Sequence, residues 1–351
     1  MPPLFKFLHS QLFFEVPYPV KSFSGQTVIV TGSNTGLGLE AARHFARLGA
    51  EKVILAVRNL AKGEAAAASI EETTGRKDAV AVWELDLASY ASVERFAARV
   101  NGLARLDVLV GNAGLLTYDF VRAEENESMM TVNVVSTLLL AILLLPKLRE
   151  TALRWQKETV LTFTGSLGHT QAEFPERKSR RILEDLADEK KARMHDRYVQ
   201  LPGSSKETSS DDALWPSSRY NVSKLIEVLL VRELADRVTS SKLPGNVVVS
   251  ILNPGIAATE MARNVGWFHG KVLKVVFGIV GRTPEAASRT IVLAAGGGQE
   301  THGKYLDDGK VGEPSAFVPS SDGNRVQKQL WDELLEKLED LHPGISALVS
   351  G

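Results

Sequence analysis

The feature that most constrains the fold is a glycine-rich turn between a β-rich run and an apolar helix pattern. The run Thr27-Val28-Ile29-Val30 leads into the turn Thr31-Gly32-Ser33-Asn34-Thr35-Gly36-Leu37-Gly38, and alanines and a phenylalanine recur at helical spacing through 37–48. Glycines permit a tight turn and leave room for a ligand close to the backbone. A strand, a glycine turn and a helix in this order typically form a phosphate-binding corner, because backbone N–H groups and the helix N-terminus face the ligand.

The alternation of strand and helix continues beyond this corner. Strand-like runs are expected at 52–57, 80–85, 107–110, 159–163 and 246–252, with helices at 60–72, 88–100, 133–148 and 220–239. This alternation predicts an α/β fold with a doubly wound parallel sheet, Rossmann-type, covered by helices on both faces. We therefore expect an N-terminal arm over 1–24, a catalytic domain over 25–320, and a C-terminal helix and tail over 321–351.

Two segments interrupt the alternation. The first, 171–218, contains a dense charge run over 173–197 and a polar stretch over 203–212. The charge run predicts a solvated helix, and the polar stretch predicts a mobile loop. The second segment, 264–282, is apolar and aromatic, with glycines near both ends. It fits either a core helix or a lid over an apolar substrate.

Composition narrows the possible functions. The chain has 351 residues, a net charge of -1 and no cysteine. The charge balance gives no sign of a nucleic-acid partner, and the lack of cysteine excludes disulfides and thiolate catalysis while fitting a reducing, cytoplasmic location. No metal site is expected, because the histidines lack ligand spacing. No apolar run is expected to reach the roughly 18 residues of a membrane span.

The N-terminal arm leaves two alternatives open. Polar residues such as Lys6, His9 and Glu15 interrupt any apolar core, so a secretory signal is not expected. One interpretation is an arm packed on the domain. The other is an amphipathic segment in contact with a membrane surface. The sequence gives no indication of the oligomeric state.

A phenol and an ammonium lie on one face of the helix expected at 220–239. Tyr220 and Lys224 are four residues apart, which places them on adjacent turns of the same face. A neighbouring cation favours the phenolate, so the pair can give and take a proton near neutral pH. Ser166 follows the strand at 159–163. A hydrolase that uses Ser166 and His169 is not expected, because no nucleophile elbow surrounds the serine.

The end of the second strand indicates which dinucleotide would bind. An acidic residue about 20 residues after the glycine turn would hold the ribose 2′-hydroxyl of NAD. This chain instead has Arg58, and no Asp or Glu lies within 53–59. A cation at this position suits a 2′-phosphate, so the sequence predicts NADP(H) as the cofactor.

Taken together, the motifs resemble the short-chain dehydrogenase/reductase family over roughly residues 25–310. The residues that carry the resemblance are Thr31-Gly32-x-x-x-Gly36-x-Gly38, Asp86-Leu87, Asn112-Ala113-Gly114, Asn133, Ser166, Tyr220-x-x-x-Lys224 and Pro254-Gly255. The chain is similar to retinol-dehydrogenase-like enzymes and to fungal short-chain reductases, whose N-terminal arm resembles 11–23. It departs from the family in the long separation of Ser166 and Tyr220, which the 171–218 insert produces.

The resemblance implies a role for each matching residue. Tyr220 would exchange the proton with the carbonyl oxygen, Lys224 would lower the tyrosine pKa and bind the nicotinamide ribose, Ser166 would hold the substrate oxygen, and Asn133 would hold a water of a proton relay. The cofactor-binding residues would be Gly32, Ser33, Asn34, Gly36, Leu37, Gly38, Arg58, Asp86, Leu87, Asn112, Ala113, Gly114, Tyr220, Lys224, Pro254, Gly255, Ile256 and Thr259.

The expected function is hydride transfer between NADP(H) and a carbonyl/alcohol substrate. The apolar segment 264–282 suggests a bulky, apolar ketone, aldehyde or secondary-metabolite intermediate as the small-molecule partner. An alternative is a catalytically silent nucleotide-binding sensor or scaffold of the same fold. A sugar-nucleotide epimerase of the extended branch is a third possibility, against which the Gly36-x-Gly38 ending of the turn argues.

Overall fold

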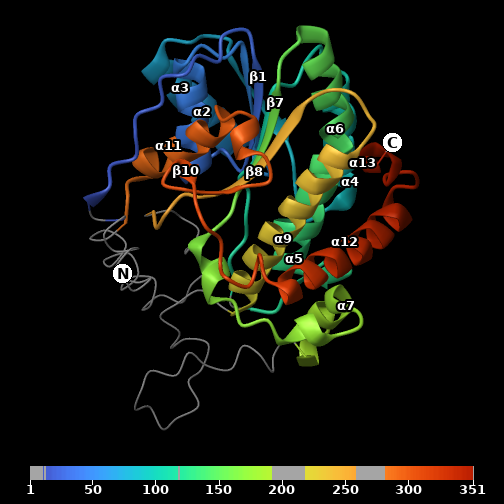
Figure 1. Ribbon diagram of the computed structural model, residues 1–351. Helices are drawn as coiled ribbons and strands as arrows, with labels where there is room; N and C mark the ends of the chain where they lie inside the picture. Colours follow the sequence, from blue (N-terminus) through green and yellow to red (C-terminus); the bar gives the residue numbers. More distant parts are fainter. Residues whose placement is uncertain (1–10, 12, 118, 192–217, 258–280, 351) are drawn as a thin grey trace.

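An eight-stranded sheet forms the centre of the protein (Figure 1). The computed structural model describes residues 11, 13–117, 119–191, 218–257 and 281–350. The strand order is β10-β9-β8-β7-β4-β1-β2-β3, and every neighbouring pair is parallel except the β9–β10 hairpin. The strands are β1 (Thr27–Thr31), β2 (Lys52–Val57), β3 (Val80–Glu84), β4 (Val108–Gly111), β7 (Thr159–Thr164), β8 (Val247–Asn253), β9 (Tyr305–Asp307) and β10 (Lys310–Val311). The predicted doubly wound parallel sheet is confirmed.

Helices cover both faces of this sheet (Figure 1). On one face lie α2 (Gly36–Arg47), α3 (Leu60–Thr74) and α11 (Pro284–Ala295). On the other lie α4 (Tyr90–Asn101), α6 (Ser136–Trp155) and α9 (Ser218–Ser240), with α12 (Ser321–Leu341) and α13 (Ala347–Ser350) packed outside them. Each face has its own apolar cluster, as expected for a sheet that is buried on both sides.

The winding of the chain determines where a ligand can bind. From β1 the chain adds β2 and β3 on one side, then returns to place β4, β7 and β8 on the other. Because the direction of winding reverses between β1 and β4, the loops leaving these two strands part and open a crevice at their carboxyl ends. The predicted glycine turn leaves β1 at this point.

The long apolar helix lies in the core. The helical stretch Ser128–Trp155 comprises α5 (Ser128–Met130), the π-helix η1 (Thr131–Val135) and α6. An apolar 18-residue window within it is 94% buried. This confirms the buried helix predicted at 133–148. The stretch is long and apolar enough to cross a membrane, so the expectation that no apolar run approaches that length was wrong. Burial under α4, α9 and α13 accounts for its hydrophobicity.

The charged run at 173–197 differs from its prediction in the described part, 173–191. Instead of one solvated helix, the chain forms the short η3 (Pro175–Lys178) and α7 (Ile182–Ala187). Ile182 and Leu183 are buried, and both donate backbone N–H bonds to the Glu333 carboxylate of α12, at 2.9 and 2.8 Å. The Glu333 carboxylate therefore caps α7 and helps to hold it against α12, with its apolar side chains buried. The remainder of the 171–218 insert, 192–217, lies outside the described residues.

The described part of the N-terminal arm packs on the domain. Val16 and Phe23 are buried, and the Tyr18 ring lies 4.3 Å from the guanidinium of Arg47 on α2 and 5.1 Å from that of Arg289 on α11. Cation–π contacts of this kind hold an extended segment against two helices. These contacts favour the packed interpretation for 13–24, while 1–10 and 12 lie outside the described residues.

The predicted strands match the observed ones within one residue at each end. Helix α4 begins at Tyr90 rather than at 88, because Ser89 caps it by accepting a bond from the Ser92 N–H. Helix α11, the β9–β10 hairpin and the small β5 (Arg122–Ala123) and β6 (Asn126–Glu127) pair were not predicted. Helix α11 covers one face of the sheet, the β9–β10 hairpin forms an edge, and the β5–β6 pair leads into the core helix.

Candidate functional site

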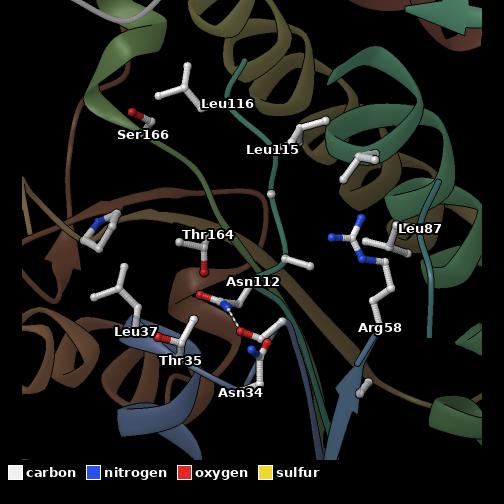
Figure 2. Close-up of a pocket in the computed structure, with 18 of the residues that line it drawn as sticks. Asn34, Thr35, Leu37, Arg58, Leu87, Asn112, Leu115, Leu116, Thr164 and Ser166 are labelled. Atoms are coloured by element: carbon white, nitrogen blue, oxygen red, sulfur yellow. Dashed lines mark hydrogen bonds between the residues drawn. The ribbon is translucent and has the colours of Figure 1, made fainter. Parts of the chain in front are cut away.

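A cavity of about 830 Å³ opens at the carboxyl ends of the central strands (Figure 2). Its walls come from the glycine turn, the segments that follow β2, β3, β4, β7 and β8, and the start of α9. The predicted site residues that line it are Gly32, Asn34, Gly36, Leu37, Gly38, Arg58, Asp86, Leu87, Asn112, Ala113, Gly114, Ser166, Tyr220, Lys224, Pro254, Gly255 and Ile256. The fold therefore brings segments more than 200 residues apart in sequence to one site.

Two predicted residues that the structure describes do not line the cavity. Ser33 and Asn133 are fully buried and do not line the cavity. The Ser33 hydroxyl donates to the Val30 carbonyl at 2.7 Å, which holds the turn against its own strand. Thr259 lies outside the described residues, as does most of the lid predicted at 264–282.

The glycine turn leaves no room for side chains at two of its positions. Gly32 has φ +65°, and a Cβ added there would lie 2.9 Å from the Ala113 Cα. A Cβ on Gly38 would lie 2.6 Å from both the Asn112 amide nitrogen and the Gly32 carbonyl oxygen. The glycines therefore let the first turn of α2 approach the segment after β4. The N-terminus of α2 faces the cavity as a result and can bind an anionic group.

Asn112 ties the two sides of the crevice together. Its side-chain amide donates to the carbonyls of Thr31, at 2.9 Å, and Gly32, at 3.3 Å. The Thr31 hydroxyl in turn accepts bonds from the backbone N–H groups of Asn112 and Ala113, both at 2.9 Å. Figure 2 shows Asn112 between Thr164 and the turn residues Asn34 and Thr35. These bonds fix the floor of the cavity.

Cationic side chains gather where β2 ends. Arg58 follows β2 directly, is exposed, and extends toward Leu87 across the cavity (Figure 2). Asn59 caps α3 by accepting a bond from the Lys62 N–H at 2.9 Å, and both of these residues line the cavity. A guanidinium, an ammonium and a helix N-terminus therefore meet at one end of the site, a combination that suits a phosphate.

The catalytic serine candidate is held in place by a residue from near the end of the chain. The His169 Nε2 accepts a bond from the Ser315 N–H at 3.0 Å, so its Nδ1 carries the proton and donates to the Ser166 carbonyl at 2.7 Å. Burial lowers the pKa of His169, which keeps the ring neutral in this role. This geometry supports the structural role expected for His169. The Ser166 hydroxyl itself lines the cavity and accepts from the Gly168 N–H at 3.0 Å.

Tyr220 and Lys224 enter the cavity from the first turns of α9. The Lys224 ammonium donates to the Thr164 carbonyl at 3.0 Å and to the Glu227 carboxylate at 2.8 Å, with both side chains of this ion pair almost fully buried. Burial lowers the pKa of Lys224, but Glu227 and Tyr220 more than offset this effect and leave the pKa raised. The lysine is therefore an ammonium at neutral pH.

Asn133 stabilises the cavity wall from behind. Its side-chain oxygen accepts from the Leu115 N–H at 2.7 Å, and its amide donates to the Leu115 carbonyl at 3.0 Å and to the Ser223 hydroxyl at 3.1 Å. Both N–H donors of the amide are thus used by protein atoms. The π-helix η1 points the side chain at Leu115, a use of irregular helix that is common near functional sites. The relay water expected at this residue stays a prediction.

The loop after β8 depends on residues that the sequence did not suggest. Asn253 accepts bonds from the Leu167 N–H at 3.1 Å and the Gly255 N–H at 3.2 Å, so it links the Ser166 loop to the Pro254-Gly255 loop. Gln11 of the arm accepts from the Ile256 N–H at 2.9 Å. An asparagine just before Pro-Gly could have suggested the first contact. Glu227 could also have been noticed, because it is an acid within the otherwise apolar run 225–231.

The mouth of the cavity near Ser166 is apolar. Leu115 and Leu116 line it, and Figure 2 shows Leu116 beside Ser166. Leu116 also packs with Met129 and Tyr220 in a small cluster separate from the two main cores. An apolar group placed next to Ser166 and Tyr220 would meet hydrocarbon there.

Fold and site together define a nucleotide-binding α/β protein whose cavity contains groups suited to proton transfer. Residues 26–167 match the family model for short chain dehydrogenases. The short-chain dehydrogenase anuD of Penicillium roqueforti is 41% identical over 348 residues, which cover 98% of this chain and 85% of the relative. The short chain dehydrogenase/reductase dmxR8 of Cryptosporiopsis is 40% identical, over 97% of this chain and 99% of the relative. The chain belongs to the short-chain dehydrogenase/reductase family and is an oxidoreductase.

Solved structures agree on the fold. A short chain dehydrogenase from Shigella flexneri complexed with NADP has a TM-score of 0.55 at 25% identity and covers 83% of this chain and 99% of its own. The 3-ketoacyl-(acyl-carrier-protein) reductase from Brucella melitensis complexed with NADH also has a TM-score of 0.55, at 21% identity, over 82% of this chain and 97% of its own. The second likeness concerns the fold alone.

Proposed function

We propose that the protein is an NADP-dependent oxidoreductase that interconverts a bulky, apolar carbonyl compound and its alcohol. One observation carries the proposal: Ser166, Tyr220 and Lys224 line the same cavity as the glycine turn and Arg58. A protein that only binds a nucleotide needs the turn but has no use for a phenol and an ammonium at the far end of the same cavity.

The cavity suits a dinucleotide. The close approach at Gly32 and Gly38 leaves backbone and helix N-terminus open to a pyrophosphate. Asp86 and Leu87 would border the adenine, Asn112, Ala113 and Gly114 its ribose, and Pro254, Gly255 and Ile256 the nicotinamide end, with Thr259 near its carboxamide. A bound nicotinamide would supply or accept the hydride.

Arg58 is the basis for proposing NADP rather than NAD. Its guanidinium can pair with a 2′-phosphate, and Lys62 lines the same end of the cavity. Among the described relatives of known structure, one is complexed with NADP and another with NADH, so the fold alone does not select the cofactor.

The proton chemistry follows from the side chains at the other end. Tyr220 would donate its phenolic proton to the carbonyl oxygen in reduction, or accept the alcohol proton in oxidation. Lys224 would stabilise the phenolate and reach the nicotinamide ribose. The Ser166 hydroxyl would donate a hydrogen bond to the substrate oxygen as negative charge develops on it. Asn133 would act through Leu115, which it holds at the cavity wall.

The apolar mouth supports an apolar substrate. Leu115 and Leu116 would remove part of such a ligand from water, at about 25 cal/mol per Å². We propose a lipophilic ketone, aldehyde or polyketide-type intermediate, in keeping with the fungal source of relatives such as anuD and dmxR8. The lid proposed at 264–282 would complete this wall.

The test is a substrate screen that follows NADPH absorbance. Apolar ketones and aldehydes of increasing size should be reduced, while small charged carbonyl compounds should react poorly, and NADH should be a weaker donor. Tight NADPH binding without turnover of any carbonyl or alcohol would instead favour the silent sensor.

A further inference from the structure

We propose that Glu227 is a positioning residue that keeps Lys224 charged inside the protein and thereby sets the pH range over which the Tyr220–Lys224 pair works. The inference rests on the proposed function for the role of the pair, but its structural basis is independent of any substrate. It adds a third member to the proton-transfer machinery, one that the cavity does not contact.

The three residues occupy one face of α9. Tyr220, Lys224 and Glu227 stand at positions i, i+4 and i+7, so each lies one helical turn from the next. The Lys224 Nζ and the Glu227 Oε2 are 2.8 Å apart, and the two side chains are 3% and 2% exposed. Along the helix, Lys224 lies between Tyr220 and Glu227. The ion pair places a buried carboxylate beside the ammonium.

Because the Lys224 ammonium is buried, it needs a carboxylate such as that of Glu227 to remain charged. An ammonium removed from water without a counter-ion tends to lose its proton. The other printed partner of Lys224, the Thr164 carbonyl, gives a hydrogen bond but no compensating charge. Within the described ranges, Glu227 is the one carboxylate that forms an ion pair with Lys224.

The charges on the elements around α9 have other partners. His169, in the short 3-10 helix η2 (Leu167–Gln171), bonds to Ser166 and Ser315. Glu127, which caps α5, pairs with Arg219 at 3.6 Å. On the α12 side, Glu233 binds Arg237 and Gln327. On α6, Lys147 pairs with Glu150.

Among the described groups, the charges that act on Lys224 are those of Glu227 and Tyr220. Burial raises the pKa of Glu227, and the Lys224 ammonium opposes this effect. Elements β8, η1 and α13 contain no titratable side chain.

Removing the Glu227 charge should shift the pH dependence of carbonyl reduction in a definite direction. A negative charge near two coupled acids makes proton loss harder from either of them. Removing that charge must therefore lower the first macroscopic pKa of the Tyr220–Lys224 pair, whichever group releases the proton. Carbonyl reduction requires the fully protonated pair, so its alkaline limit would move to lower pH.

Two matched variants test this prediction. Glu227→Gln keeps the shape and a hydrogen-bond acceptor but removes the charge, whereas Glu233→Gln removes an equally buried carboxylate of the same helix that faces Arg237 instead. The alkaline limit of NADPH-dependent reduction should fall by about one pH unit in Glu227→Gln. It should stay in place in Glu233→Gln. Equal alkaline limits in wild type and Glu227→Gln would overturn the inference.

Thermal unfolding against pH gives a second measurement that needs no substrate. In Glu227→Gln the folded state holds an unpaired ammonium, so the pKa of Lys224 falls below its unfolded value of about 10.4. The unfolded state then binds more protons, and stability rises with pH in that window. The Tm deficit against wild type should be largest near pH 7 and shrink toward pH 10. A deficit that does not change with pH indicates packing alone and overturns the inference.

The Glu233→Gln deficit should not vary over this range, because an arginine stays charged. If Glu227→Gln does not fold, Lys224→Met combined with Glu227→Gln should recover the folded state, because the unpaired charge is gone. A double variant no more stable than the single one also overturns the inference. If wild type reduces no carbonyl, the proposed function fails. The unfolding measurements still test whether Glu227 keeps Lys224 charged.

Discussion

The two halves of the cavity are built in different ways. The nucleotide half, around β1, β2 and α2, depends on the close approach of the glycine turn to the Asn112–Ala113 segment, which the Asn112 amide and the Thr31 hydroxyl bridge. The catalytic half, around β7, β8 and α9, is held by side chains from distant parts of the chain. Its Ser166 loop is held through Ser315, 146 residues from His169, and its Ile256 loop through Gln11, 245 residues away.

The two halves of the cavity therefore depend on different kinds of residue. The nucleotide half needs particular glycines, because added atoms would collide with the opposite wall. The catalytic half needs particular polar side chains, because its loops have few partners nearby in sequence. Substitutions should therefore be able to damage one half while leaving the other intact, and the following predictions are ordered by the size of the expected effect.

Tyr220→Phe should disable the catalytic half alone. We expect turnover to fall about 10³-fold, because the proton donor is lost, while NADPH affinity changes little. Steady-state rates and an equilibrium NADPH titration measure the two quantities. Tyr305→Phe is the matched control, since the Tyr305 hydroxyl is buried with no hydrogen-bond partner among the described residues and lies outside the cavity. A Tyr220→Phe enzyme that keeps most of its turnover would rule out the proposed mechanism.

Gly38→Ala should disable the nucleotide half. The added methyl group would lie 2.6 Å from two fixed polar groups, so α2 must move away from the Asn112 segment. We expect a loss of NADPH affinity of up to about 100-fold and a destabilisation of about 1–3 kcal/mol. Gly102→Ala is the control, because a Cβ there has its nearest contact at 3.4 Å. Equal affinities in both variants would show that the close approach does not matter.

Arg58→Ala should change only which dinucleotide is preferred. Losing a charge-assisted bond to the 2′-phosphate should weaken NADPH binding about 30-fold and leave NADH binding nearly unchanged. Lys77→Ala removes an exposed cation that does not line the cavity and serves as the control. Parallel losses for both cofactors would argue against the proposed NADP preference.

Gln11→Ala should have the smallest effect, and it should be confined to the catalytic half. Loss of one bond to the Ile256 N–H should raise KM for NADPH about fivefold. Binding of adenosine 2′,5′-bisphosphate, which occupies only the nucleotide half, should not change. Weaker binding of this fragment would mean that the arm supports the whole cavity rather than one end.

Much of the fold could be predicted because the relevant signals are local. Alternating apolar runs and helix patterns located the strands closely, and positive φ at Gly32 and Gly36 agrees with the tight turn expected there. The glycine turn, Arg58, Ser166, Tyr220 and Lys224 were then identified as neighbours. Parallel strands carry their carboxyl ends to the same edge, so motifs that follow strands must meet.

The parts that sequence could not predict depend on distant partners. The charged segment 173–191 was expected to be solvated, but Glu333 caps α7 across about 150 residues. The bonds of the Asn133 amide to Leu115 and Ser223 were not predicted from the sequence. Glu227 stands out in the sequence as an acid within an apolar run, but its partner Lys224 becomes evident only from the buried ion pair.

The bond between Ser315 and His169 has a consequence for the synthesis of the protein. A ribosome adds roughly 5–20 residues per second, so the 146 residues between these two partners take about 7–30 s to make. Throughout that interval β1, β2 and the glycine turn have already been made, while the His169 ring lacks its bond from Ser315. The newly made chain can therefore assemble the nucleotide half of the cavity well before it can orient Ser166.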